Sequence, residues 1–113
     1  MPESFDLTGL DAVSSGISTF ADAGQRYVYV PTLRLPSGCA PAIAAALICM
    51  DPRDNYPTRL FLSEKVSTTA RQLNWNTSVA IAGKTWHSFS WNYVPSSLRP
   101  VEVLIGHLAA FLP

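Results

Sequence analysis

The stretch SLRPVEVLIGHLAAFLP, residues 97–113, is the clearest helix signal in the chain. Apolar residues recur in it at steps of three and four, which puts them on one stripe of an α-helix: Val101, Leu104, Ile105, Leu108, Phe111 and Leu112. Ser97 is expected to cap the N-terminus, and Pro100 suits the first turn because its missing N–H would have no intrahelical partner. Such a helix must bury its stripe against something, and the preceding segments must supply that surface.

Upstream of this helix, the chain has the pattern of strands separated by turns. Residues 25–35 carry β-branched and aromatic side chains around Pro31, which predicts a strand bent at that proline. The run 42–50 predicts a strand buried on both faces, although its alanines would also suit a helix. Further strands are expected at 59–62 and, as a hairpin around Gly83, at 79–82 and 85–91. The order of these elements therefore predicts a fold of the α+β class: an antiparallel β-meander with a C-terminal helix packed on it.

Residues 1–24 form a weakly patterned N-terminal segment, interrupted by Gly9, Gly16 and Gly24. This segment leaves room for a short helix near Asp11 to Phe20. Residues 25–113 are expected to form the folded domain, because a chain of 113 residues can build one core but not two. Within that domain, 63–76 is rich in Ser, Thr, Asn and charge and predicts a loop.

Charge is balanced and sparse. The chain has 8 Lys plus Arg and 8 Asp plus Glu, a formal net charge of +0, which argues against nucleic-acid partners because these need a basic stripe. Only 14% of residues are charged, so uncharged groups must cover part of the surface, and such surface often belongs against a protein partner. The longest apolar run, 40–50, is too short for a bilayer, and Glu3 and Asp6 stand where a signal peptide would be basic. We expect a cytoplasmic protein with no membrane partner.

Two motifs suggest a family. The stretch Ile48-Cys49-Met50-Asp51-Pro52-Arg53-Asp54-Asn55-Tyr56-Pro57 joins a strand to a Tyr-Pro turn, and Ser97-Leu98-Arg99-Pro100 opens the final helix. In this order and spacing the chain, over roughly 25–112, resembles the ubiquitin-conjugating (UBC-like) fold, in particular the divergent prokaryotic families that accompany ubiquitin-like proteins. The resemblance implies a component of a bacterial ubiquitin-like conjugation pathway. Its partners would be a ubiquitin-like protein and an activating-enzyme-like adenylyltransferase, with no cofactor.

The family's catalytic cysteine is missing from its expected place. That cysteine stands about ten residues before the proline of the helix, where this chain has Ser90, and no cysteine lies between Met50 and Pro113. The resemblance therefore implies either an oxyester carrier with Ser90 as the acceptor or a variant without catalysis. A serine nucleophile needs a base, and His87 is the nearest candidate by sequence. In a regular strand, positions 87 and 90 face opposite ways, so the two meet only at a bulge or a strand end.

Several uncharged side chains are candidates for the binding surface around this position. They are Trp86, Trp91 and Tyr93, as aromatic anchors that could also be core residues, and Asn76, which could supply an amide to the site.

The competing hypothesis is a small metal-binding accessory protein of the same kind of gene cluster. Its ligands would come from a scattered set of thiol, carboxylate and imidazole groups: Cys39, Cys49, Glu64, His87, Glu102 and His107. Zinc sites usually have closely spaced ligand pairs such as CxxC or HxxxH, and the chain has neither. No metal site is therefore assigned, and both cysteines are expected to be free thiols, Cys49 buried and Cys39 in an accessible turn.

Overall fold

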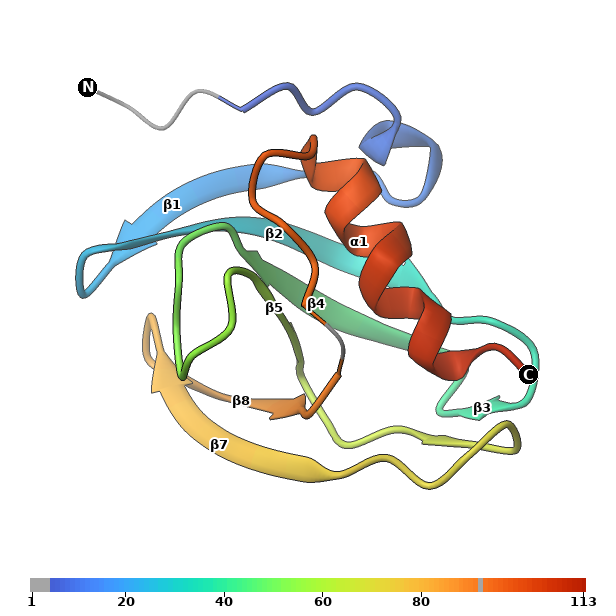
Figure 1. The fold of residues 1–113 in the computed structure, drawn as a ribbon. Helices are drawn as coiled ribbons and strands as arrows, with labels where there is room; N and C mark the ends of the chain where they lie inside the picture. The colour runs from blue at the N-terminus through green and yellow to red at the C-terminus, as the bar shows by residue number, and fades with distance from the viewer. Residues whose placement is uncertain (1–4, 92) are drawn as a thin grey trace.

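The structure is a computed structural model that describes residues 5–91 and 93–113. In this part of the chain, strands come first and one α-helix comes last (Figure 1). The elements are the 3₁₀ turn η1 Leu10–Ala12, β1 Ser18–Asp22, β2 Gln25–Arg34, β3 Cys39–Ala40, β4 Ile43–Cys49, β5 Arg59–Leu62, β6 Ser67–Thr68, β7 Trp75–Ile81, β8 Lys84–Phe89, α1 Pro100–Leu108 and the 3₁₀ turn η2 Ala109–Phe111. The predicted α+β class, with an antiparallel sheet and a C-terminal helix, is confirmed.

Six strands form the main sheet, in the order β1-β2-β4-β5-β8-β7, and every pairing in it is antiparallel. Four of them follow one another as in a meander. The last hairpin consists of β7 and β8. Its second strand, β8, pairs with β5, so β7 forms an edge of the sheet. The short strands β3 and β6 pair separately. The register of β2 on β4 shifts between Val30 and Leu33, where the sequence predicted a bend at Pro31.

Two hairpins use the same two-residue turn. Ala23 and Gly24 have φ angles of 51° and 80°, and Ala82 and Gly83 have 51° and 83°. Two left-handed residues in succession are typical of the type I′ turn, which matches the twist of antiparallel strands. The tips of the hairpins meet, because the Ala82 N–H donates to Asp22 Oδ2 at 3.0 Å. Since β1 and β7 are opposite edges of the sheet, this contact shows that the sheet curls, and both tips lie side by side at the left of Figure 1.

Alternate residues of the sheet pack on opposite sides. On the side of α1, the core contains Val28 of β2, Ile48 of β4, Leu60 of β5 and Phe111 of η2. The other side holds a smaller core, built from Tyr27, Leu47, Cys49, Phe61, Ile81 and Trp86. The run 42–50 is therefore a strand, β4, and from Ala46 to Cys49 it is buried on both faces as predicted. No helix in the described part of the chain has the length and apolar character needed to cross a bilayer.

The N-terminal segment differs from the prediction. No helix extends from Asp11 to Phe20: the 3₁₀ turn η1 ends at Ala12, and Phe20 lies in β1. The β1 strand pairs with β2 from Ser18↔Tyr29 to Asp22↔Gln25, so residues 18–22 are part of the sheet. The Ala23-Gly24 turn favours the hairpin, and cross-strand pairs such as Phe20 stacked on Tyr27, with ring centroids 5.2 Å apart, stabilise the strand.

The final helix begins two residues later than expected. Arg99, not Ser97, is the N-cap, because the residue before a proline favours extended backbone and Arg99 has ψ 154°. Its N–H donates to Glu102 Oε1 at 3.0 Å. The buried stripe is also turned relative to the prediction, since Ile105 and Leu112 are exposed whereas Val103 and His107 are buried. Apolar residues surround this helix on most sides, so the spacing alone allowed both registers.

Gly106 lets α1 approach the segment that leads into it. A Cβ at this position would lie 2.9 Å from Val94 Cγ1 and 3.2 Å from Val94 Cγ2, and Val94 is buried. We expect Gly106→Ala to lower the free energy of unfolding by about 1 kcal/mol, because overpacking of ~1–3 kcal/mol outweighs the gain of ~1 kcal/mol in helix propensity. Urea unfolding measures this, with Ile105→Ala as the exposed control. A stabilised Gly106→Ala protein would contradict the close approach.

Candidate functional site

A tight turn after β4 brings the Tyr-Pro motif back against the sheet. Arg53 and Tyr56 exchange two backbone hydrogen bonds, each of 2.9 Å, around Asp54 and Asn55. Both central residues have left-handed φ angles, 54° and 69°, which Asp and Asn adopt more readily than most residues. The turn thereby sets the Asp54 carboxylate and the Tyr56 ring beside the first residue of β5, Arg59.

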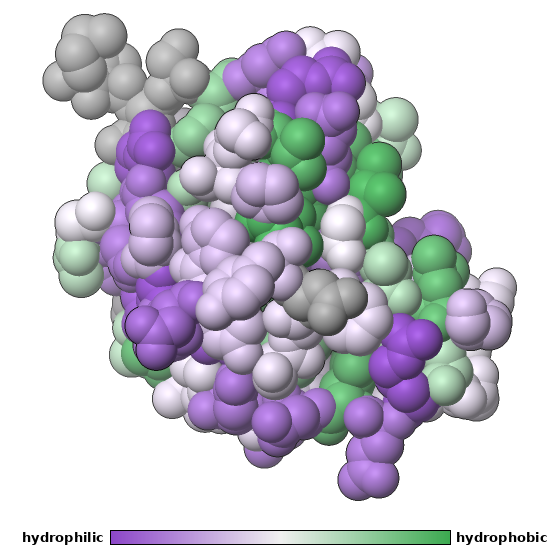
Figure 2. Space-filling view, in the orientation of Figure 1, coloured by the Kyte–Doolittle hydropathy of each residue, from purple (hydrophilic) through white to green (hydrophobic). Residues whose placement is uncertain are grey.

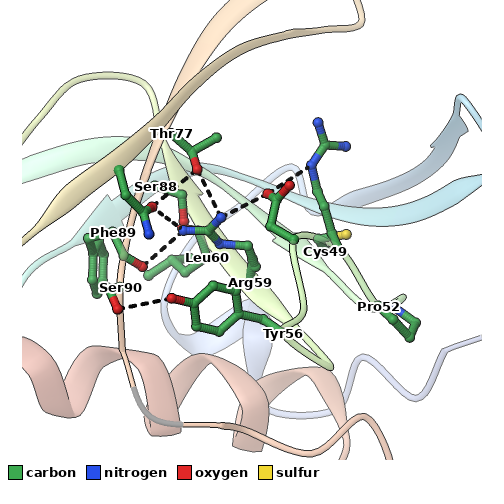
Figure 3. A network of polar contacts seen from close by, with 12 residues as sticks. Cys49, Pro52, Tyr56, Arg59, Leu60, Thr77, Ser88, Phe89 and Ser90 are labelled. Atoms are coloured by element: carbon green, nitrogen blue, oxygen red, sulfur yellow. Dashed lines mark hydrogen bonds and ion pairs between the residues drawn. The ribbon is translucent and has the colours of Figure 1, made fainter.

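Arg59 is the centre of a buried polar network, shown in Figure 3. Its side chain is only 2% exposed. Its Nη1 donates to Asp54 Oδ2 at 2.8 Å and to Thr77 Oγ1 at 2.9 Å. Its Nη2 donates to Asn76 Oδ1 at 2.7 Å and to the Phe89 carbonyl at 3.1 Å. One guanidinium therefore ties the Tyr-Pro turn to both strands of the last hairpin.

Aromatic rings complete the environment of this cation. The guanidinium carbon lies 4.5 Å from the ring centroid of Tyr56 and 5.8 Å from that of Phe61. A buried charge is tolerated only where hydrogen bonds and an opposite charge replace water, and Arg59 has both. The Asp54 carboxylate is its ion-pair partner and stays 47% exposed, so the network reaches the solvent at that point.

Ser90 lies at the edge of this network, just beyond β8. Tyr56 Oη donates to Ser90 Oγ at 2.9 Å (Figure 3). The Ser90 N–H donates to the Asn74 carbonyl at 2.8 Å. The serine is half-buried. Its hydroxyl therefore has a phenol as its neighbour, and this phenol donates its proton into the hydrogen bond rather than taking one from the serine.

His87 does not serve Ser90. The histidine lies on β8 opposite Ser78 of β7, and its Nδ1 is 2.7 Å from Ser78 Oγ. Among the hydrogen bonds of residues 5–91 and 93–113, none joins His87 to Ser90. The pairing of β7 with β8 is irregular, but the extra residue lies on β7, between Trp75 and Thr77, and β8 has no bulge that would bring His87 to Ser90.

The four predicted binding residues lie in different environments. Asn76 belongs to the Arg59 network, and Tyr93 is 70% exposed with its ring 5.9 Å from that of Tyr56. Trp91 is half-buried, donates from Nε1 to the Gly106 carbonyl at 3.1 Å and has the Arg71 guanidinium 5.1 Å over its ring. Trp86 lies in the core on the side of the sheet opposite α1. Asn76 is thus part of the network through its bond to Arg59, and Tyr93 lies beside it through its contact with Tyr56. Trp91 binds α1, and Trp86 is part of the separate, smaller core.

The candidate metal ligands do not form a cluster. Within the described residues, no three His, Cys, Asp or Glu side chains are grouped so that they could hold an ion. Both cysteines are free, and burial raises the pKa of each thiol. Glu102 pairs with Arg99 on the surface, with Arg99 Nε 3.3 Å from Glu102 Oε1. His107 is buried against Thr58, with Nε2 3.0 Å from Thr58 Oγ1.

The prediction missed Arg59, Asp54 and Thr77. A signal for Arg59 was present, since an arginine begins the otherwise apolar strand Arg59-Leu60-Phe61-Leu62 directly after a Tyr-Pro turn. Charged residues are almost never fully buried unless they are paired, so such a position indicates a specific partner. Thr77 carried no comparable signal, because only the pairing of β7 with β8 brings it to the guanidinium.

Replacing Tyr56 by phenylalanine tests the link to Ser90. The ring over Arg59 would remain, and the hydrogen bond to Ser90 Oγ would be lost. We expect the free energy of unfolding to fall by about 1 kcal/mol, the usual net value of one such bond. Urea unfolding measures the change. Tyr93→Phe is the matched control and should change stability by less than ~0.5 kcal/mol, because that residue is largely exposed; equal effects of the two variants would contradict the bond.

Fold and site together define an α+β protein with a curled antiparallel sheet, one C-terminal helix and a buried arginine network. Compared with protein-family models, curated proteins and solved structures, the chain has no significant match.

Proposed function

We propose that the chain is a non-catalytic, UBC-like component of a bacterial ubiquitin-like conjugation pathway, which binds a ubiquitin-like protein or its activating-enzyme-like adenylyltransferase. The order of elements supports this. The strand β4, the Tyr-Pro turn, β5 and a helix that begins at Pro100 follow one another in the order on which the resemblance rests.

The state of Ser90 carries the non-catalytic part of the proposal. Serine accepts an acyl group only when a base within hydrogen-bond reach takes its proton. Here the hydroxyl accepts a hydrogen bond from Tyr56, and the nearest histidine by sequence, His87, is bonded to Ser78. The Arg59 guanidinium packs against the Tyr56 ring, so the folded structure holds Tyr56 beside Ser90. A protein that only binds its partners does not need Ser90 to act as a nucleophile.

The surface around the final helix supports a protein partner. Its large exposed apolar side chains are Tyr93, Leu98, Ile105 and Leu112. Figure 2 shows this face, with pale, weakly polar residues and hydrophobic green ones over its centre and strongly hydrophilic residues toward its edges. Apolar and aromatic side chains within a polar rim are typical of protein interfaces, whose central aromatic residues contribute most of the binding energy.

The experiment mixes the purified chain with ATP, with a bacterial ubiquitin-like protein and with the adenylating enzyme that activates that protein. Gel filtration detects a stable complex, and intact-protein mass spectrometry detects a covalent adduct. We expect a complex with at least one of the two proteins and no adduct. Tyr93→Ala should weaken that complex at least tenfold, as expected for an aromatic anchor, and Ser96→Ala, an exposed serine in the same segment, should not.

Two results would overturn the proposal in different ways. An adduct that Ser90→Ala abolishes and Ser96→Ala retains would make the chain an oxyester carrier, so the non-catalytic reading would be wrong. If the chain forms neither a complex nor an adduct with either partner, its proposed role in a ubiquitin-like conjugation pathway would be wrong.

A further inference from the structure

A cavity of about 220 Å³ lies on the side of the sheet opposite α1, near the meeting point of the two hairpin tips. Its walls come from strands that are distant in the sheet: Phe20, Tyr29, Leu47, Ile81, Lys84 and Trp86. None of these residues belongs to the Arg59 network. The cavity exists because the sheet curls, which brings β1 and β2 toward β7 and β8 over this face.

Aromatic rings form the walls, and their positions are fixed. Tyr29 meets Trp86 edge to face, with ring centroids 6.4 Å apart and planes at 82°. Phe20 is stacked on the buried ring of Tyr27. The contact between Ala82 and Asp22 joins the hairpins at the cavity's end. Walls held in this way lose little side-chain freedom when a ligand enters, which favours binding of a flat, apolar group.

Two residues of the cavity lining, Lys84 and Tyr29, carry polar groups that can bind a negative charge. Among the hydrogen bonds and ion pairs of the described residues, neither the Lys84 ammonium nor the Tyr29 hydroxyl has a partner. The Asp22 carboxylate, which accepts the Ala82 N–H, is not among the residues that line the cavity. An unpaired cation and an unpaired hydroxyl beside aromatic walls are complementary to a ligand that has a carboxylate on a ring.

We propose that this cavity binds a small planar aromatic carboxylate, with its rings against Tyr29 and Trp86 and its carboxylate at Lys84. The volume sets the size, because pockets for drug-sized ligands begin at about 300 Å³, so one or two fused rings fit here. This site is independent of the proposed conjugation role, since it lies on the side of the sheet away from α1 and its lining includes neither Ser90 nor a residue of the Arg59 network.

The test is a titration of the full chain with naphthalene-2-carboxylate, followed by ¹H–¹⁵N NMR. We expect the largest shifts at the amides of Phe20, Tyr29 and Trp86. Lys84→Gln should weaken binding of the carboxylate by about fivefold, the upper range for one exposed ion pair, and leave binding of the neutral naphthalene-2-carboxamide unchanged. Lys65→Gln, the chain's other lysine, is the matched control and should change neither ligand's affinity.

A second variant tests the aromatic wall without relying on a fully buried residue. Tyr29 is half-buried, so Tyr29→Leu should fold, and we expect it to weaken both ligands at least fivefold. No saturable shift at millimolar concentration, or shifts at Leu73 and Trp75 in place of the cavity residues, would overturn the site. Equal effects of Lys84→Gln and Lys65→Gln on the carboxylate would overturn the recognition of its charge.

Discussion

Replacing Arg59 with methionine is expected to lower the free energy of unfolding by about 3 kcal/mol, a loss that urea unfolding would show as a lower midpoint with an unchanged slope. Methionine keeps most of the apolar stem and removes the guanidinium. The variant therefore isolates the network from the packing of the side chain.

The magnitude follows from the groups that lose their partner. The Phe89 carbonyl becomes a buried acceptor without its Arg59 donor, and a lone buried polar group costs ~1–3 kcal/mol. The Asp54 carboxylate loses its nearest ion-pair partner, but it is 47% exposed and can be hydrated, so its share is smaller. The cation on the rings of Tyr56 and Phe61 adds to the loss. These terms put the effect at the low end of the ~3–5 kcal/mol seen when one partner of a buried pair is removed.

Arg34→Met is the matched control, because Arg34 is exposed on β2. Its unfolding free energy should stay within ~0.5 kcal/mol of the unchanged chain. If Arg59→Met were as mild as Arg34→Met, the network would not stabilise the fold, and the fixed position of Tyr56 beside Ser90 would lose its basis.

Local signals were enough to predict most strands and the fold class. Gly83 between the strand-like runs 79–82 and 85–91 predicted the last hairpin, and the apolar run 42–50 predicted β4. The β1 strand was missed because Ser18–Asp22 has a mixed composition, and pairing with β2 decides its structure. The helix register was wrong because residues 101–112 are apolar on too many sides for spacing to select one stripe.

The candidate site was harder to predict, since its contacts join residues far apart in the sequence. Asp54 and Arg59 are neighbours along the chain, but Thr77 and Phe89 reach the guanidinium only through the pairing of β5, β8 and β7. Ser90 and His87 looked like a pair because they are close in sequence. Tertiary contacts gave each of them a different partner, Tyr56 and Ser78.

The second large effect is a loss of stability in mild acid, caused by His107. Burial, and to a smaller extent the nearby charge of Arg59, lower the pKa of this imidazole to about 4. Thr58 Oγ1 donates to the Val94 carbonyl at 2.7 Å and therefore accepts from His107 Nε2, which fits the neutral ring. The folded protein thus holds this histidine uncharged at a pH where the unfolded chain protonates it.

The sign of the pH dependence follows from that difference. The folded pKa, about 4, lies below the unfolded value of 6.5, so the unfolded state binds more protons between the two. The free energy of unfolding keeps its full contribution from His107 above about pH 6.5. It falls as the pH drops toward 4, by about 3 kcal/mol in total at 1.36 kcal/mol per pKa unit. The carboxylates of Asp6, Asp51 and Glu102, whose pKa values are lowered, contribute their losses mainly below this window.

Urea unfolding at several pH values between 4 and 7.5 measures this loss. The variant His107→Gln keeps a donor for Thr58 and cannot be protonated, so its stability should be nearly flat between pH 5 and 6.5, where the unchanged chain loses ~1–2 kcal/mol. His87→Gln removes the chain's other histidine, leaves the buried one in place and should retain the slope. In Arg59→Met the slope should become shallower, because the charge that adds to the lowering of the His107 pKa is gone. A slope that survives His107→Gln and disappears in His87→Gln would show that His87, not His107, causes the acid sensitivity.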